Sequence, residues 1–324
     1  MIPVPHQRPS SGVSGDLMTL FSNPKNLIAL CLWMAGAAAA LSDPQRDDRH
    51  NSASLWILTT PDGAAMPEGS VVEGFPLLIR LDGGSFRFDE ARPNGGDLRF
   101  ALAEGNAQQE IRMSWGPGDT AAAAGGSRVF DASNGYLGVW HLESARDQVG
   151  GGIARDSGTT ATRGVVGPAR HLAEGQGLFA GDMLSGYPTG SSPHTTEAWI
   201  RPSKPNTTVI GWGNEEAQGK VVLQFRSPPH IGVDAYFSDA NIQGRTKIPT
   251  GEWTHVVHTY EPGRTRLYVN GVLDAESLRR SSPLNVHSPA RLWMGGWYDH
   301  YSFEGDLDEV RVSNTARSAD WVRL

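Results

Sequence analysis

The segment that most constrains the fold is the last third of the chain, residues 251–324, in which short alternating runs are separated by turn residues. Residues 252–260 alternate in the manner of a half-buried strand, and residues 265–269 form a second such run. Asn270 and Gly271 follow directly, and both tolerate the positive φ angles of a type I′ hairpin turn. The pattern predicts an antiparallel, all-β fold.

The composition agrees with such a fold and limits the partners. The 39 glycines and 21 prolines supply turns, and 39% hydrophobic residues are enough for a core. A formal net charge of −7, with no basic stripe and no zinc-ligand spacing, argues against a nucleic-acid partner. Contact with a membrane is expected only through an uncleaved leader or a partner complex.

The order of motifs in this segment is similar to a known family. It reads "W-x-H-V, Y-V-N-G-V, G-G-W, G-x-L-D-E-V-R-V, A-R-S-x-x-W", and "V-W-H-L" at 139–142 matches the family's usual first strand. The order resembles the laminin-G-like, concanavalin A-like jelly-roll domains of bacterial surface proteins. The resemblance implies an antiparallel jelly-roll β-sandwich over residues 133–324, in a family that chiefly binds and of which only some branches are enzymes.

A smaller β region precedes it, over residues 43–115. Its series "F-P-L-L-I-R-L-D", "F-R-F-D-E-A", "G-G-D-L-R-F" and "I-R-M-S-W-G" is similar to a bacterial domain of unknown function, number 2341. In that family a long stretch with a further strand separates the last two motifs, whereas here only residues 101–109 join them. We therefore expect an incomplete β-sandwich with open edges. Residues 116–132, rich in glycine and alanine, are the predicted linker.

The first 42 residues have the pattern of an export signal. Lys25 precedes an apolar run over 27–40, which ends in small residues that suit a cleavage site. A signal peptide cleaved near Leu41 or Asp43 is predicted, with an uncleaved membrane anchor or a buried helix as the alternative. The protein is then exported to the periplasm, the cell envelope or the extracellular space. Cys31 is the single cysteine, so cleavage would leave no thiol chemistry.

Two constellations could carry catalysis or metal binding. Glu304, Asp306 and Asp308 alternate as the carboxylates of concanavalin-type glucanases do, but their face continues into Val310 and Val312 and so is expected to turn into the core. The resemblance implies instead a closing structural strand, with Asp308 accepting backbone hydrogen bonds from a neighbouring loop. No catalytic residue is assigned.

The histidines of the H-x-x-H motif are predicted to point to opposite faces of one strand, His255 as a structural residue and His258 exposed or partly packed. They therefore cannot form a metal pair. Calcium is a possibility at family level, through Asp182 and Asp299 in loops, but no D-x-D-x-D-G loop occurs and no metal ligand is assigned.

The candidate binding surface is an aromatic loop near the C-terminus, with a second patch of similar character. Aromatic faces stack on sugar rings while polar side chains reach the hydroxyl groups. The loop and the patch contain the following candidates: Trp297, Tyr298, Asp299, His300 and Tyr301, and then Trp212 and Asn214. The alternative is that both tryptophans plug sheet ends and that Tyr298 packs on the neighbouring domain.

Three functions remain open. The chain is predicted to be an exported, non-catalytic module that recognises carbohydrate or another cell-envelope component. The first alternative is a periplasmic scaffold or spacer that works with an envelope protein, in a transport assembly of the MotA/TolQ/ExbB type. The second alternative is a glycan hydrolase that uses the acidic strand.

Overall fold

The computed structural model describes most of the chain after residue 128 and shorter stretches before it. The described residues are 28–33 (backbone only), 51–59, 63–81, 83, 86–92, 95, 97–102, 110–116, 129–297 and 302–324. They belong to two units: the first comprises Met1–Ile28, Ala39–Leu58 and Leu81–Ala124, and the second comprises Ala29–Ala38, Thr59–Arg80 and Gly125–Leu324. None of the helices in the described ranges has the length and apolar character that a membrane span needs.

The first unit contains a three-stranded antiparallel sheet in the order β2-β5-β4. The strands are β2 (Asn51–Trp56), β4 (Arg99–Leu102) and β5 (Glu110–Trp115). Met113 on the central strand is fully buried, and Phe86 packs edge-on against Trp115 with ring centroids 5.0 Å apart. The carboxylate of Asp97 accepts the backbone N–H groups of Arg92 and Gly116. This small sheet lies within the β region predicted for residues 43–115.

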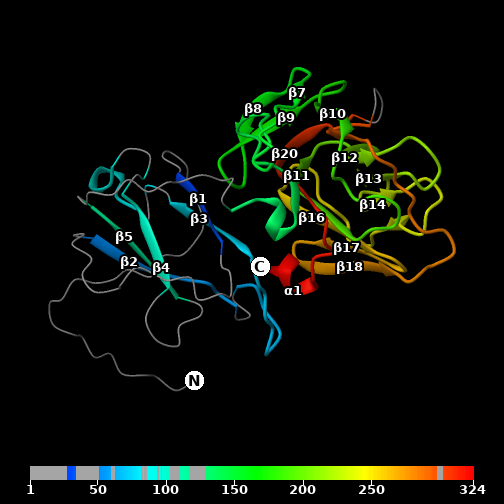
Figure 1. Cartoon of the computed structure of the whole chain (residues 1–324). Helices are drawn as coiled ribbons and strands as arrows, with labels where there is room; N and C mark the ends of the chain where they lie inside the picture. Colours follow the sequence, from blue (N-terminus) through cyan, green and yellow to red (C-terminus); the bar gives the residue numbers. More distant parts are fainter. Residues whose placement is uncertain are drawn as a thin grey trace, which may run out of the picture. The chain divides into compact units, whose positions relative to one another are not determined.

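The second unit is a β-sandwich of two antiparallel sheets (Figure 1). The seven-stranded sheet has the order β15-β14-β13-β12-β19-β10-β7, and the eight-stranded sheet has the order β18-β17-β16-β11-β20-β9-β8, with β6 added beside β20. The strands are β6 (Tyr136–Trp140), β7 (Arg155–Asp156), β8 (Thr160–Arg163), β9 (Pro168–Leu172), β10 (Leu178–Leu184), β11 (His194–Pro202), β12 (Thr207–Gly213), β13 (Lys220–Phe225), β14 (Ile231–Asp234), β15 (Ile242–Gln243), β16 (Thr254–Glu261), β17 (Arg264–Val269), β18 (Val272–Ser277), β19 (Ala290–Met294) and β20 (Gly305–Ser313). The predicted antiparallel, all-β sandwich is confirmed.

The main core lies between the two sheets. The longer strands contribute alternate residues to it, such as Val221, Leu223 and Phe225 on β13 and Ala198 and Ile200 on β11, all fully buried. Each large apolar side chain moved out of water stabilises the fold by about 1.5–3 kcal/mol. The predicted hairpin is also present, since Asn270 and Gly271 have positive φ angles and join the paired residues Val269 and Val272.

A second core cluster covers part of the outer face of the eight-stranded sheet. The short helix α1 (Ala319–Arg323) brings Trp321 and Val322 to this cluster, with Ser318 as its N-cap. Phe75, from the segment before β3 (Pro76–Leu81), packs edge-on against Trp321 at 5.0 Å. Val129 and Phe130 belong to the same cluster although they lie within the predicted linker, so the packed part of the second unit begins before residue 133. Part of one outer face of the sandwich is thereby closed from solvent.

The predicted leader lies almost entirely outside the described residues. Ile28–Trp33, in its apolar run, forms strand β1, which pairs with β3 in a two-stranded sheet. Signal cleavage and export stay predictions, as does the separation of residues 43–115 from residues 133–324 by a linker.

Candidate functional site

Strand β20 carries the acidic residues that suggested catalysis, and an irregularity in it decides where they point. Glu309 has a left-handed φ of 48°. The pairing with β11 places Trp199 opposite Asp308 but Glu197 opposite Arg311, so β20 holds one extra residue there, as in a β-bulge. The bulge reverses the side-chain alternation.

The prediction that Asp306 and Asp308 share a face with Val310 and Val312 is therefore wrong. Both valines lie in the sandwich core together with Leu307, whereas the two aspartates lie on the outer face of the eight-stranded sheet. The physical reason is the extra residue at Glu309, because strand alternation has a period of two and one inserted residue inverts it.

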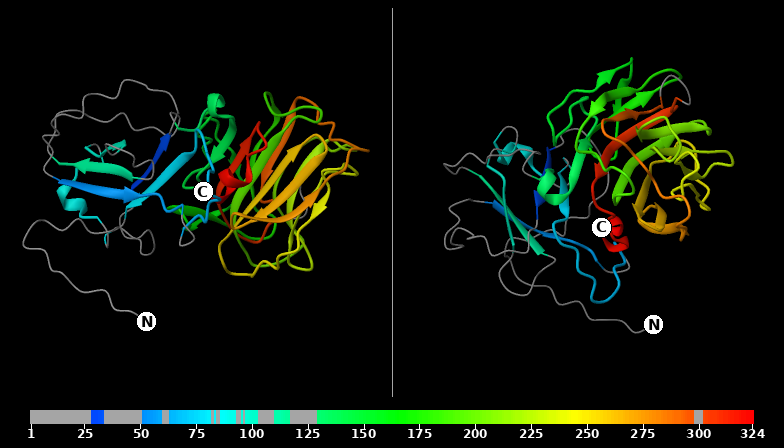
Figure 2. Two further views of the ribbon diagram at one scale, coloured as in Figure 1. Left: turned by 90° about the horizontal axis from the view of Figure 1, so that it is seen from below. Right: turned by 45° about the vertical axis from the view of Figure 1, so that its right-hand side comes forward.

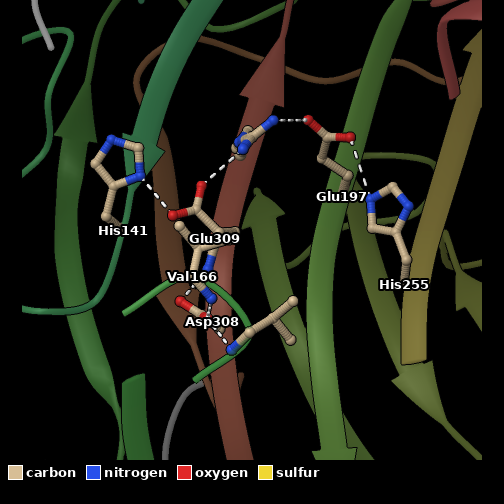
Figure 3. A network of polar contacts seen from close by, with 8 residues as sticks. His141, Val166, Glu197, His255, Asp308 and Glu309 are labelled. Atoms are coloured by element: carbon tan, nitrogen blue, oxygen red, sulfur yellow. Dashed lines mark hydrogen bonds and ion pairs between the residues drawn. The ribbon is translucent and has the colours of Figure 1, made fainter. Parts of the chain in front are cut away.

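Asp308 holds a loop in place, as predicted. Its Oδ2 accepts the backbone N–H groups of Val165 and Val166 at 2.7 and 3.0 Å (Figure 3). Gly164 makes this approach possible, because a Cβ there would lie 2.2 Å from Oδ2 of Asp308. Burial, together with the neighbouring charge of Glu309, raises the pKa of Asp308 to about 8 despite these hydrogen bonds.

Beside Asp308, a chain of alternating basic and acidic side chains crosses the same face (Figure 3). His141 Nδ1 lies 2.6 Å from Glu309 Oε1, and Arg311 Nη2 lies 2.7 Å from Glu309 Oε2. Arg311 also reaches Glu197 at 3.5 Å, and Glu197 is 3.5 Å from His255 Nε2. Burial favours the neutral form of each glutamate, but the charge of Arg311 and the hydrogen bond to histidine outweigh it. The pKa of Glu197 and that of Glu309 are therefore below their usual value.

Asp306 on this strand and Glu304, which directly precedes the strand, are likewise engaged. The two oxygens of Asp306 contact His171 at 2.8 Å and Arg201 at 2.6 Å. Glu304 pairs with Lys204 at 2.7 Å. Glycoside hydrolysis needs a pair of carboxyl groups that face the sugar, one of them free to give a proton and the other to attack or activate water. Carboxylates that are already bound to cations or loop amides do not provide that arrangement.

The histidine pair lies on opposite faces, as expected, but the placement predicted for His258 is wrong. His258 is fully buried, with Nε2 2.9 Å from Thr265 Oγ1, because the aromatic rings of the inner face pack around it. His194 lies 5.4 Å from it, stacked on Tyr260. Burial lowers the pKa of His194 to about 4 and holds the pKa of His258 well below its usual value. Both are neutral core residues.

The structure brings the two predicted binding patches together at one residue, Gly211. Trp212 points into the sandwich core and donates its Nε1–H to Thr196 Oγ1 at 2.9 Å. Because strand residues alternate, Gly211 faces the outer side of the sheet. A Cβ at this position would lie 2.4 Å from Cε3 of Trp297. The indole of Trp297 thus lies on the outer face of the seven-stranded sheet, with an exposed fraction of 2%. Neither tryptophan offers an open ring face to solvent, which agrees with the alternative that both are packing residues.

The other predicted binding residues have different positions. Asn214 is structural at both ends of its amide: Nδ2 donates to the carbonyl of Pro289 at 2.9 Å, and Oδ1 accepts the backbone N–H of His287 at 2.7 Å. Tyr298, Asp299, His300 and Tyr301 lie outside the described residues.

Around Trp297 a set of charged groups lies on the same outer face. The side chain of Lys220 is 10% exposed, and its Nζ is 2.9 Å from Glu215 Oε1 and 3.4 Å from Asp234 Oδ2. Glu215 also accepts the indole N–H of Trp297. Lys220 Nζ lies 5.0 Å from the ring centroid of Tyr236. These groups supply both donors and acceptors beside an aromatic ring.

Two adjacent aromatic residues, Tyr236 and Phe237, form an exposed ledge directly after β14, here named the Tyr236–Phe237 ledge. Their exposed fractions are 38% and 75%. Both have left-handed φ angles, 47° and 67°, a conformation that costs a non-glycine residue about 1–2 kcal/mol. The backbone is held there by hydrogen bonds from the N–H of Tyr236 to Asp234 and from the N–H of Gln218 to the Tyr236 carbonyl. The sequence analysis missed this ledge, although an aromatic pair between polar residues was its visible signal.

A pocket of about 490 Å³ lies further along the same sheet, and its lining includes Asn206, Gln224, Arg226, Ser227 and Asp234. Arg226 lies flat over Gly232, where a Cβ would come within 2.8 Å of the guanidinium. Its Nε donates to Gln224 Oε1 at 3.0 Å and its Nη1 to Gln243 Oε1 at 2.9 Å. The guanidinium is therefore fixed in one orientation at the wall of the pocket.

The calcium prediction receives no geometric support from Asp182. The residue lies within strand β10 rather than in a loop, and its carboxylate is 3.8 Å from Arg291. Over the described residues no group of three or more histidine, cysteine, aspartate or glutamate side chains could hold a metal ion. Asp299 falls outside those residues.

Comparison with known proteins agrees with the architecture. The family described as the concanavalin A-like lectin/glucanases superfamily matches residues 181–323. No curated protein matches the chain. The resemblance of residues 43–115 to the domain of unknown function is not confirmed.

The solved structures that match part of this chain include three described as domains that bind or complex a ligand. Domain 4 of AbnA, an extracellular arabinanase from Geobacillus stearothermophilus, in complex with arabinotriose, is 20% identical and has a TM-score of 0.48, covering 58% of this chain and 97% of that one. The binding domain of Paraclostridial Mosquitocidal Protein 1 is 13% identical, with a TM-score of 0.46 and coverages of 59% and 51%. The CBM40 of the Ruminococcus gnavus IT-sialidase, bound to α2,3-sialyllactose, is 16% identical, with a TM-score of 0.40 and coverages of 48% and 94%.

Proposed function

We propose that the sandwich is a non-catalytic carbohydrate-binding module of an exported protein, and that the glycan contacts the outer face of the seven-stranded sheet at the Tyr236–Phe237 ledge. The observation that carries the proposal is the ledge itself. Two neighbouring aromatic rings are held in a costly backbone conformation and left exposed. Strained residues of this kind persist where the surrounding structure enforces them, and they cluster at binding sites.

The surroundings of the ledge suit a sugar. The apolar C–H face of a pyranose packs on an aromatic ring, while its hydroxyl groups need both donors and acceptors. Lys220 supplies an ammonium group next to the Tyr236 ring, and Glu215 and Asp234 supply carboxylates within 3.4 Å of that ammonium. A mixed set of polar groups beside an open aromatic surface favours a polyhydroxylated ligand over a purely apolar one.

The competing functions have less support. A hydrolase would need the acidic groups of β20, and these are bound to cations or to loop amides. A structural spacer in an envelope transport assembly would leave the ledge without a ligand, and no contact among the described residues argues for that role. Binding is therefore the function that the geometry favours.

The proposal is tested on a glycan array, with and without calcium, using the mature chain. Phe237→Ala and Tyr236→Ala should each weaken binding of the recognised glycan by about 1–3 kcal/mol, by analogy with aromatic stacking on nucleic-acid bases. Trp56→Ala is the matched control, since Trp56 is also exposed, at 46%, but lies in the first unit. A wild-type chain that binds no glycan would favour the spacer, and turnover of a bound polysaccharide would favour the hydrolase.

A further inference from the structure

The second feature of the same outer face is Arg226, a partly buried cation without a carboxylate within 4.0 Å among the described residues. Arg317 also has none, but its guanidinium lies against the Tyr136 and Trp321 rings and donates to the Asn134 carbonyl. Arg170, Arg201, Arg311 and Lys220 each have a carboxylate within 4.0 Å. In the described part of the chain Arg226 has none, and its two hydrogen-bond partners are the neutral side chains of Gln224 and Gln243. An unpaired, partly desolvated guanidinium is costly, and a bound anion would offset that cost.

The carboxylate nearest to the pocket does not supply that anion. Asp234 lines the same pocket, but its Oδ2 pairs with Lys220 at 3.4 Å and its Oδ1 accepts the N–H of Tyr236 at 3.0 Å. Burial lowers the pKa of Arg226 from its usual value, and a guanidinium nevertheless stays charged at any physiological pH. Asp234 therefore offsets the charge of Arg226 only in part and forms no ion pair with it within 4.0 Å, so the guanidinium faces the pocket without a bound carboxylate.

The guanidinium of Arg226 is also held in an orientation that suits ligand binding. Its Nε and Nη1 are anchored by the two glutamines, and Gly232 beneath it leaves room for the flat guanidinium. Within the described residues Nη2 has no hydrogen-bond partner, so donors remain for a ligand. Planar, pre-oriented guanidinium groups are the side chains that recognise carboxylates with defined geometry. Asn206 and Ser227, on the pocket wall, add amide and hydroxyl groups.

The ledge and the pocket lie along one strand. Lys220, beside the ledge, and Gln224, in the pocket, are both outward-facing residues of β13, because the residues between them alternate with the core positions Val221 and Leu223. Four residues of strand correspond to about 13 Å. A short oligosaccharide can cover that distance.

We infer that the Arg226 pocket is a subsite for the carboxylate of an acidic sugar, so that the recognised glycan is an acidic oligosaccharide lying along β13 with one ring at the Tyr236–Phe237 ledge. This inference rests on the proposed function, and it adds the chemical class of the ligand. The carboxylate pairs with the Arg226 guanidinium, while hydroxyl groups of the same residue reach Asn206 and Ser227.

The test uses the mature full-length chain and an array that pairs each carboxylated oligosaccharide with its methyl ester, which keeps the shape and removes the charge. The wild type should prefer the free acid by about tenfold or more, equivalent to ~1.4 kcal/mol. Arg226→Gln should remove that preference, and Arg226→Lys should retain part of it, because an ammonium keeps the charge but not the planar fork. Gly232→Ala should act like Arg226→Gln, since the new Cβ displaces the guanidinium without changing any charge.

The controls separate the two proposals. Phe237→Ala should weaken binding of acid and ester alike, and Arg279→Gln, at an exposed arginine, should change neither. If the wild type binds acid and ester equally through Phe237, or if Arg226→Gln keeps the preference, the acidic subsite is wrong while the glycan module stands. If the wild type binds no member of the array, both proposals are wrong. Melting temperatures of the Arg226 variants within a few degrees of the wild type would show that the sandwich remains folded.

Discussion

The two outer faces of the sandwich bear similar side chains but use them differently. Figure 2 shows the strands of the two sheets from two further directions. On the eight-stranded sheet, Glu197 and Glu309 are buried, and both pair with the largely buried Arg311 between them. On the seven-stranded sheet, the aromatic ledge is exposed and Arg226 has no carboxylate partner among the described residues. Charged residues are therefore structural where other parts of the chain cover the sheet, whereas on the seven-stranded sheet the ledge and Arg226 remain available to a ligand although Trp297 and Lys220 are buried.

The largest effect should come from opening the buried charge chain. Arg311→Ala leaves the Glu309 and Glu197 carboxylates buried without their shared cation, and breaking such a network costs about 3–5 kcal/mol of folding free energy. Chemical denaturation of the full chain measures the loss. Arg266→Ala, which breaks the more exposed pair with Glu276, is the control and should cost less than ~1 kcal/mol. Equal losses from both variants would contradict the distinction between a buried charge network and a more exposed ion pair on the same sheet.

Next comes Trp297, which lies on the open sheet and is nonetheless buried. Trp297→Ala should reduce the free energy of unfolding by about 3 kcal/mol, the lower part of the range for a buried tryptophan, because the ring packs on Gly211 rather than in the sandwich core. Thermal denaturation gives the value. A nearly unchanged melting temperature combined with weaker glycan binding would show instead that the indole acts as the stacking platform.

A comparable effect is expected from acid, through the core histidines. Because the pKa of His194 is about 4 in the folded chain and 6.5 in the unfolded chain, the unfolded chain takes up this proton first as the pH falls. The stabilisation is complete above about pH 6.5 and is lost as the pH falls through 4, by about 3 kcal/mol in total. His258 acts in the same direction.

The pH dependence due to His194 is measured as the difference in stability between the wild type and His194→Gln. A difference is needed because Asp308 changes the stability of both proteins with pH in the opposite direction. Its raised pKa makes its contribution greatest below pH 3.8, and this is lost as the pH rises through about 8. The stability advantage of the wild type over His194→Gln should therefore shrink by about 3 kcal/mol between pH 7 and pH 4. A constant difference across that range would mean that His194 is protonated as easily in the folded chain as in the unfolded one.

The smallest change in stability is expected at the ledge. The size of the change shows whether the Phe237 ring serves binding or packs in the fold. Phe237→Gly removes an exposed ring and relieves a left-handed φ of 67°. The free energy of unfolding should stay the same or rise by up to about 1 kcal/mol, while glycan binding is lost. Denaturation and array binding are measured on the same preparation, with Phe237→Ala as the matched variant that keeps a Cβ. A marked loss of stability would identify the ring as a packing residue.

Several features could be predicted from the local sequence. The alternating runs of the last third predicted strands that agree closely with β16, β17 and β20, and the Asn270-Gly271 pair predicted the hairpin between β17 and β18. The bonding of Asp308 to a neighbouring loop was also foreseen, from the family resemblance. These features depend on neighbouring residues or on a recurring motif, and so they can be predicted from the sequence alone.

The candidate site was far less predictable. Trp297 and Trp212 were singled out as aromatic residues, but their burial depends on which residues the sheet places beside them, Gly211 for one and the sandwich core for the other. The ledge was missed, because exposure of Tyr236 and Phe237 follows from the path of the loop after β14 rather than from residue type. The full burial of His258 likewise depends on partners from other strands.

The sequence by itself determined that this protein is an antiparallel β-sandwich, because the period of two in its strands and the φ preferences of its turn residues act between neighbours in the chain. Only the tertiary structure decided which charged residues are structural. One extra residue at Glu309 inverted the face of β20, and a distant loop then supplied the amides that enclose Asp308. Burial and electrostatic pairing arise between segments far apart in the sequence, so the difference between a closed face and an open one exists only once the sheets have formed.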